Sequence, residues 1–230
     1  MSIGAVLDEA WSLYTKFFLR FFLIAVIVFA VVNAIYGLIV VAVESGDGTS
    51  VLLALAGVAA SVVGTYWLQG ALVFAVQDAR DGAIDASIGE IFRKVTPLLG
   101  TLIAAGLLAG IGIAIGFLLL IVPGLFLLTI WSVVAPAIVV EGKSVGEAFS
   151  RSRELVKGHG WTVFAVVLIT AILSAIASGL LQLAFSFLPR FLEIFIGGTI
   201  ASAVVAPFTA TALTVMFFRL RDSVSPTAAL

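Results

Sequence analysis

The chain has 230 residues, of which 62% are hydrophobic and only 11% are charged, and its formal net charge is −1. Ordinary soluble domains carry about 25% charged residues, so this composition excludes such a domain and predicts an integral membrane protein without affinity for nucleic acid. The lack of cysteine and the single histidine exclude disulfides, thiolate chemistry and a histidine-rich metal site.

Residues 2–18 are predicted to form an amphipathic helix in the membrane surface, because their apolar side chains recur on one helical face. Trp11 and Tyr14 on that face suit the headgroup region, where a ring can be buried while its polar atom stays hydrated. Two apolar spans and a charged, solvated connector are predicted next, at 21–43, 51–76 and 77–86.

A second amphipathic segment begins at Ser87 and leads into 95–140, a run without any charged residue. As one helix this run would be about 69 Å long, roughly twice the hydrocarbon core of a bilayer. Val122-Pro123-Gly124 is the expected turn near its middle, since proline denies the helix a donor and glycine accepts a left-handed backbone. The run therefore predicts a transmembrane hairpin with spans at 97–121 and 125–140.

A third amphipathic segment is predicted at 144–157, and Gly158-His159-Gly160 is expected to end it. Two further spans are predicted at 161–188 and 194–218, joined by a tight turn at Pro189-Arg190. Pro136 and Pro207 are expected to kink their spans.

The three amphipathic segments begin alike, with Ser2-Ile-Gly-Ala-Val-Leu, Ser87-Ile-Gly-Glu-Ile-Phe and Ser144-Val-Gly-Glu-Ala-Phe. Each serine is expected to cap a helix, and the glutamate of the second and third copies completes a capping box that the first copy lacks. We therefore predict one all-α integral membrane domain over 1–230. Its six transmembrane helices form three parallel repeats of an amphipathic surface helix plus a transmembrane hairpin, at 2–77, 87–140 and 144–218.

Eleven of the twelve Lys and Arg residues lie on the side of the predicted surface helices and both termini, and only Arg190 lies on the other side. This positive-inside bias predicts that both termini are cytoplasmic.

No ionisable residue lies near the middle of a predicted span, which argues against proton-coupled transport and intramembrane proteolysis. We find no catalytic constellation, cofactor motif or metal-ligand cluster, and predict a protein that is not an enzyme. Asn33, Tyr66 and Gln69 are candidates for lining an intramembrane cavity. The alternative is that they form hydrogen bonds between helices.

The third amphipathic segment carries a basic cluster just before Trp161 that is predicted to attract the headgroups of membrane lipids, anionic ones included. A role in setting the topology alone is the alternative. The predicted headgroup residues are Arg151, Arg153, Lys157 and His159.

The third span carries two patterns of small residues four apart, Gly106 to Gly110 and Gly112 to Gly116, which allow close helix packing. They are expected to pack within the monomer, and a homo-oligomer through this glycine face is the alternative.

From Val122-Pro-Gly, through a span ending at Pro136 and Glu141-Gly142, to Ser144-Val-Gly-Glu-Ala, the chain resembles a known membrane family. The N-terminal pattern Ser2-Ile-Gly-x-x-Leu-Asp-Glu-Ala-Trp fits as well. The family is the membrane domain fused to some bacterial glycerophosphodiester phosphodiesterases and found alone in other prokaryotic six-span proteins. The resemblance implies a prokaryotic cytoplasmic (inner) membrane location. It does not imply hydrolase activity, because the phosphodiesterase domain and its acidic metal ligands are missing here.

Together these observations predict a non-enzymatic integral membrane protein that interacts with lipids, in membrane organisation, lipid movement or support of a partner. The alternative is a transporter or channel for a neutral or apolar solute, for which Asn33, Tyr66 and Gln69 would line the path.

Overall fold

The computed structural model describes residues 2–44, 50–82 and 86–224, and within these ranges the chain is helical and contains no strand. Six segments are long and apolar enough to cross a bilayer, so the protein is a multi-pass membrane protein, as its composition predicts. The first half contains α1 (Ile3–Lys16), α2 (Phe18–Glu44), α3 (Ser50–Arg80), α4 (Ile88–Val95), the 3₁₀ turn η1 (Thr96–Leu98) and α5 (Leu99–Leu119). The second half contains α6 (Ile121–Ile130), α7 (Val134–Glu141), α8 (Val145–Val156), α9 (Gly160–Phe185), α10 (Arg190–Leu192), the π-helical turn η2 (Glu193–Gly197) and α11 (Gly198–Val224).

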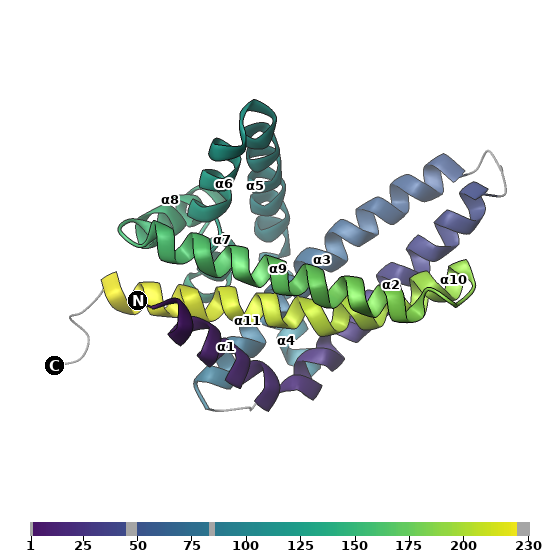
Figure 1. Cartoon of the computed structure of the whole chain (residues 1–230), viewed down its shortest axis with the longest axis horizontal. Helices are drawn as coiled ribbons and strands as arrows, with labels where there is room; N and C mark the ends of the chain where they lie inside the picture. Colours follow the sequence, from purple (N-terminus) through teal and green to yellow (C-terminus); the bar gives the residue numbers. More distant parts are fainter. Residues whose placement is uncertain (1, 45–49, 83–85, 225–230) are drawn as a thin grey trace.

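The long helices form three hairpins, α2 with α3, α5 with α6, and α9 with α10 to α11, which leave a common body (Figure 1). In each hairpin the second span is more deeply buried than the first. In the most apolar part of each span, 33%, 39% and 50% of residues are buried in the second spans, against 22%, 17% and 17% in the first. The second spans meet at the centre, where α3, α7 and α11 contact one another through small and branched side chains, including Val73, Val133, Ala137, Ala212, Val215 and Met216.

The three short amphipathic helices α1, α4 and α8 begin at capping serines, as predicted. The Glu90 carboxylate accepts hydrogen bonds from the Ser87 amide at 2.7 Å and hydroxyl at 2.9 Å, and Glu147 does the same for Ser144 at 2.9 and 2.6 Å. At α1 the Ser2 hydroxyl accepts only the Ala5 amide, at 3.3 Å. The prediction that only the second and third copies carry the reciprocal glutamate contact is confirmed.

Each amphipathic helix packs beside a second span through aromatic contacts. Trp67 of α3 meets Phe92 of α4 edge-on, with ring centroids 5.0 Å apart, and Trp131 after α6 meets Phe149 of α8 at the same distance. Trp11 of α1 lies 6.0 Å from the ring of Phe208 in α11. Helix α11, the last helix of the chain, thus packs against α1, the first.

The turn of the α5–α6 hairpin is at Leu120, so its predicted position at Val122-Pro123-Gly124 is wrong. Leu120 is extended, with φ −163° and ψ 155°, and α6 begins at the next residue. Pro123 therefore lies in the first turn of α6, where its missing N–H would have no intrahelical partner in any case. Gly124 allows the ring of Phe117 to pack closely against α6, since a Cβ at this position would lie 2.4 Å from that ring.

The span predicted at 125–140 is two helices, because the α-helix is interrupted at 131–133. The interruption comes just before Pro136, which cannot donate to the carbonyl of Ser132, and so lies close to the expected kink. Helix α11, in contrast, continues through Pro207. The connector predicted at 77–86 is shorter than expected, since α3 continues to Arg80, and its residues 83–85 lie outside the described residues.

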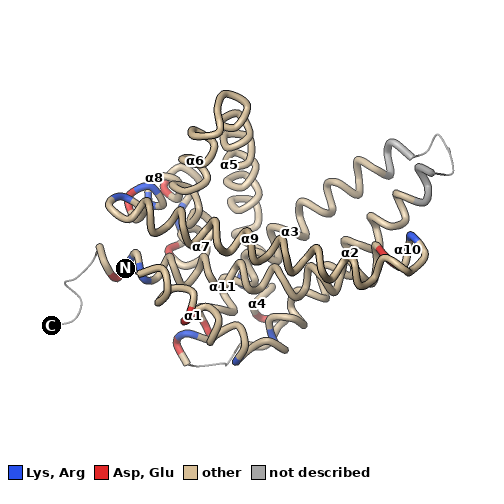
Figure 2. The backbone as a smooth tube through the Cα atoms, in the orientation of Figure 1, with Lys and Arg blue, Asp and Glu red and all other residues tan. Residues whose placement is uncertain are grey.

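Charged residues gather around α1, α4, α8 and the ends of α3, α7 and α11, while the projecting hairpins are almost free of them (Figure 2). The exception among the described hairpin ends is α10 and its neighbour η2, which carry Arg190 and Glu193. We call the charge-rich side of the molecule the charged end.

Candidate functional site: a groove between α6 and α9

A groove of about 680 Å³ lies between α6 and the start of α9. One wall belongs to α6 and consists of Val122, Leu125, Phe126, Thr129 and Ile130. The other wall belongs to the α8–α9 link and the first turns of α9, with Gly158, His159, Gly160, Trp161, Thr162 and Phe164. Trp161, Val122 and Phe126 are 85%, 74% and 59% exposed, so the groove is open on its outer side.

One end of this groove is polar because of how the chain passes from α8 to α9. The Lys157 amide closes α8 on the carbonyl of Arg153 at 3.1 Å, and Gly158 turns the chain with φ +86°, a conformation that favours glycine. Helix α9 then begins at Gly160 without a side-chain cap. Its first amides therefore lack a side-chain acceptor, and the helix dipole adds a partial positive charge at the same place.

His159 stands at this polar end. Its amide donates to the carbonyl of Val156 at 2.9 Å, which positions the residue, and its Nδ1 atom is buried without a hydrogen-bond partner among the described residues. A buried polar atom of this kind favours a bound ligand or water as its partner.

The rest of the groove is apolar. Thr129, the one hydroxyl on the α6 wall, donates to the carbonyl of Leu125 at 2.7 Å within its own helix. The hydroxyl is satisfied locally, so the wall offers mainly aliphatic and aromatic surface. A ligand that fits the groove is apolar over most of its length and polar at the His159 end.

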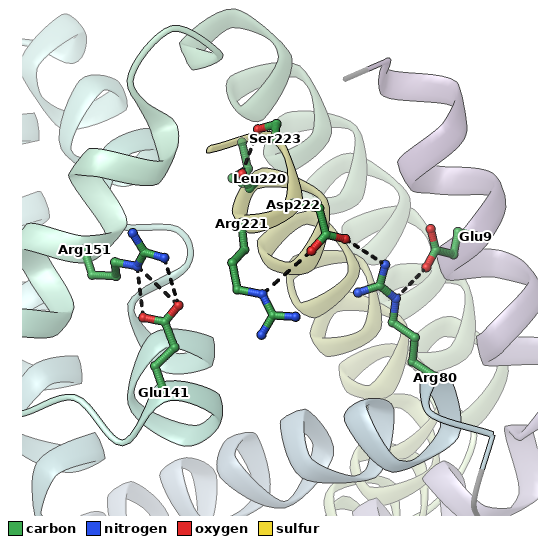
Figure 3. Close-up of polar contacts among 8 residues, drawn as sticks. All are labelled: Glu9, Arg80, Glu141, Arg151, Leu220, Arg221, Asp222 and Ser223. Atoms are coloured by element: carbon green, nitrogen blue, oxygen red, sulfur yellow. Dashed lines mark hydrogen bonds and ion pairs between the residues drawn. The ribbon is translucent and has the colours of Figure 1, made fainter. Parts of the chain in front are cut away.

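Of the predicted headgroup residues, Arg151 is held by carboxylates (Figure 3). Its Nε and Nη2 donate to Glu141 at 2.9 and 3.1 Å, as Figure 3 shows. Its Nη1 donates to Glu154, which the figure does not draw, at 3.0 Å. The hydrogen bonds to Glu141, and then that to Glu154, raise the pKa of Arg151 above its ordinary value against the opposing effect of burial. Three of the five N–H groups of Arg151 are thus already engaged.

Arg153 and Lys157 are exposed and form no ion pair within the part of the chain that the structure describes. Lys157 directly precedes Gly158 of the groove. At this end, Arg153 and Lys157 are therefore the cations free to meet a headgroup. His159 offers its imidazole ring inside the groove.

A second polar cluster ties α1 to the last turns of α3 and α11. Glu9 accepts from Arg80 Nε at 3.1 Å, and Arg80 also lies 3.6 Å from Asp222 (Figure 3). Glu9 accepts in addition from Arg219 Nε at 2.6 Å. Arg80 stacks over the ring of Phe218, 4.6 Å from its centroid. Sequence reasoning counted these arginines toward topology and missed their partners, which lie 71 and 210 residues away along the chain.

The residues proposed to line a cavity do not face one another. Asn33 Nδ2 donates to Thr199 of α11 at 3.4 Å, whereas the Tyr66 ring lies against Gly106 of α5. Gln69 is partly buried on α3, three residues after Tyr66. Asn33 and Tyr66 thus serve two different helix contacts, and neither they nor Gln69 line the α6–α9 groove.

Three of the four glycines in the α5 pattern pack inside the monomer. A Cβ at Gly112 would lie 2.6 Å from the Trp131 ring, one at Gly116 would lie 3.0 Å from the Gly124 backbone, and one at Gly106 would overlap Tyr66. Gly110 has nothing within 4 Å. The expected packing within the monomer is confirmed for these three positions. Of the four glycines, only Gly110 has no packing partner among the described residues.

Within the described ranges, no three His, Cys, Asp or Glu side chains gather as metal ligands. No curated protein and no solved structure matches the chain. A family model described as a domain of unknown function, DUF7847, matches residues 66–220. This match covers about two thirds of the chain, including both walls of the groove, and the protein therefore belongs to the DUF7847 family.

Proposed function

We propose that this protein is a non-enzymatic protein of the prokaryotic cytoplasmic membrane that binds a phospholipid in the α6–α9 groove. The observation that carries the proposal is the polarity of that groove, which is apolar along α6 and polar at the α8–α9 link. An acyl chain would lie along Leu125 and Phe126, and the headgroup would lie at His159 and the first amides of α9.

The headgroup end favours an anionic lipid. The uncapped helix start offers amide donors and a partial positive charge, and a phosphate is a good acceptor for both. Lys157 and Arg153 add attraction of about 1 kcal/mol per charge at a membrane surface. Arg151 is omitted from this site because it is paired with Glu141 and Glu154 and does not line the groove.

The apolar part of the groove selects ligands by their shape and adds little to the binding affinity. A lipid tail gains little by leaving other tails for an apolar groove, because bilayer hydrocarbon is as apolar as the groove wall. Discrimination between lipids therefore depends on the headgroup contacts. A large side chain introduced into the groove would prevent binding by excluding the acyl chain of the lipid. Membrane organisation, lipid movement and support of a partner would all start from such binding.

The orientation and the threefold repeat belong to the same proposal. The repeat is supported by the three capping serines, by the deeper burial of each second span, and by the contacts of Phe92, Phe149 and Trp11 with those spans. The charged end gathers eleven of the twelve Lys and Arg residues on one side, which supports cytoplasmic termini. Kinship with the phosphodiesterase-associated membrane domain remains part of this proposal, on the motifs given above.

The test is native mass spectrometry of the protein purified in mild detergent. We expect bound phospholipid in the wild type, an enrichment of anionic species, and its loss in L125W, which fills the groove. L180W is the matched control, since Leu180 is 63% exposed on α9 and lies outside the groove.

A second variant, K157Q/H159Q, examines the headgroup end. We expect it to retain lipid without preference for anionic species. Equal lipid retention in L125W and L180W would contradict the proposed site, and an unchanged headgroup preference in K157Q/H159Q would contradict the assigned headgroup contacts.

A further inference from the structure

The tip of the α5–α6 hairpin is apolar in a way that the other described hairpin tip is not. The five consecutive residues 118–122 are all Leu, Ile or Val, and each is between 68% and 86% exposed. No residue from 102 to 128 has a polar side chain. A tip that emerges into water on the far side of a membrane would place this aliphatic surface in contact with water.

The α9–α10 tip has a different character. Ser186 is exposed there, and Arg190 has a 62% exposed side chain that lies 3.9 Å from Glu193. In the first hairpin, the sequence between α2 and α3 carries Asp47. Polar and charged groups of this kind suit a tip that meets water.

The α5–α6 hairpin is also shorter. Helix α5 has 21 residues, against 27 in α2, 31 in α3 and 26 in α9. Twenty-one residues rise about 32 Å, which only just equals the hydrocarbon thickness of about 30 Å when the helix stands upright. A tilt of α5 beyond about 20°, the average for membrane-spanning helices, leaves the tip within the acyl region.

The backbone of the tip is suited to an environment with little water. The Leu120 amide donates to Gly116 at 3.0 Å, and the Gly124 amide donates to Leu120 at 3.5 Å. Pro123 between them has no amide proton to satisfy. Bilayer hydrocarbon excludes backbone whose polar groups are unsatisfied. Leu120 and Gly124 have bonded amides and Pro123 has no amide proton, so these three residues bring no unsatisfied amide into the hydrocarbon.

We propose that residues 118–122 lie among the lipid acyl chains of the leaflet opposite the charged end, so that the α5–α6 hairpin is re-entrant. Its two ends meet water at α4 and α8, while its tip does not. The partner of this surface is lipid hydrocarbon. This inference does not depend on lipid binding in the groove, because it concerns the exposed tip of the hairpin.

Because the chain contains no cysteine, one introduced cysteine is the single site at which a thiol-reactive label can attach. Single-cysteine variants L120C and S186C carry a nitroxide spin label and are reconstituted into liposomes. Collision rates are then measured with oxygen, which concentrates in hydrocarbon, and with a water-soluble nickel chelate. We expect the label at 120 to collide frequently with oxygen and several-fold less with the chelate than the label at 186.

Two results overturn the proposal. Chelate collisions at 120 equal to those at 186 would place the tip in water. Low collision rates with both reagents at 120 would mean that protein, for example a second copy of the chain, covers the tip. L119C repeats the measurement at the same tip and outside the groove, since Leu119 is 71% exposed, so that a folding defect of L120C leaves the question answerable.

Discussion

The Arg151 guanidinium lies on the Glu141 carboxylate ten residues earlier in the chain, with Nε 2.9 Å from Oε2 and Nη2 3.1 Å from Oε1. Between them Gly142 ends α7 in a left-handed conformation, with φ +65°. The pair therefore fixes α8 to the end of α7, and α8 in turn leads to the polar end of the groove. An arginine expected to bind lipid thus positions the helix that presents the other candidates.

R151A is expected to lower the free energy of unfolding by about 1–2 kcal/mol, because it leaves the largely buried Glu141 carboxylate without its charged donor. R153A should leave stability within about 0.5 kcal/mol of wild type, since Arg153 is exposed. Thermal unfolding in detergent, followed by the fluorescence of the four tryptophans, measures both. Equal destabilisation by the two variants would contradict a structural role for Arg151.

Glu9 is expected to hold α1 onto the rest of the molecule through Arg80 and Arg219. E9Q removes the charge from the centre of this cluster and should increase amide hydrogen exchange in α1 and lower stability by about 1 kcal/mol. D8N is the matched control, because Asp8 is exposed and makes no ion pair among the described residues. Unchanged exchange in E9Q would mean that apolar packing alone retains α1.

The start of α8 is expected to be pH-sensitive. Hydrogen bonds from the Ser144 hydroxyl and amide hold the pKa of Glu147 below its ordinary value of 4.5. A carboxylate with a depressed folded-state pKa stabilises the fold above the unfolded value and loses this contribution as the pH falls through the folded value. The protection factor of the amides in the first turn of α8, which compares the observed exchange rate with the intrinsic rate at the same pH, should therefore decrease below about pH 4.5.

E147Q provides the control for this pH dependence. Glutamine can still accept the Ser144 hydrogen bonds but does not titrate. The acid-dependent decrease in the protection factor should therefore be absent in E147Q, with a moderate protection factor at every pH. The same acid-dependent decrease in E147Q and wild type would assign the effect to another group.

G112A and G110A form a matched pair on one helix. A Cβ at Gly112 would lie 2.6 Å from Trp131, so G112A should destabilise the fold by about 1–3 kcal/mol, whereas G110A meets no neighbour and should be neutral or slightly stabilising. Thermal unfolding measures the difference. A G110A variant that loses an oligomer seen in the wild type by light scattering would support the alternative of a homo-oligomer through the glycine face.

The features that the sequence predicted are those set by local chemistry. Stretches of about twenty apolar residues must be helical in a bilayer, because only helices satisfy their own backbone there, and the six helices long and apolar enough to cross a membrane followed from composition alone. The capping contacts of Ser87 and Ser144 involve groups three residues apart, so they too could be predicted. The turn was predicted at Pro123 and not at Leu120, because proline is compatible both with a turn between helices and with the first turn of a helix.

Tertiary structure alone decided which charges pair and where the groove lies. Arg80, Arg151 and Arg219 have the same local character as Arg153, and only the approach of distant helices gives the first three carboxylate partners. The groove likewise needs α6 beside the start of α9, about thirty residues later in the chain. Contacts between distant segments depend on how whole helices pack, and a local pattern of residues carries no information about which helix will be the neighbour.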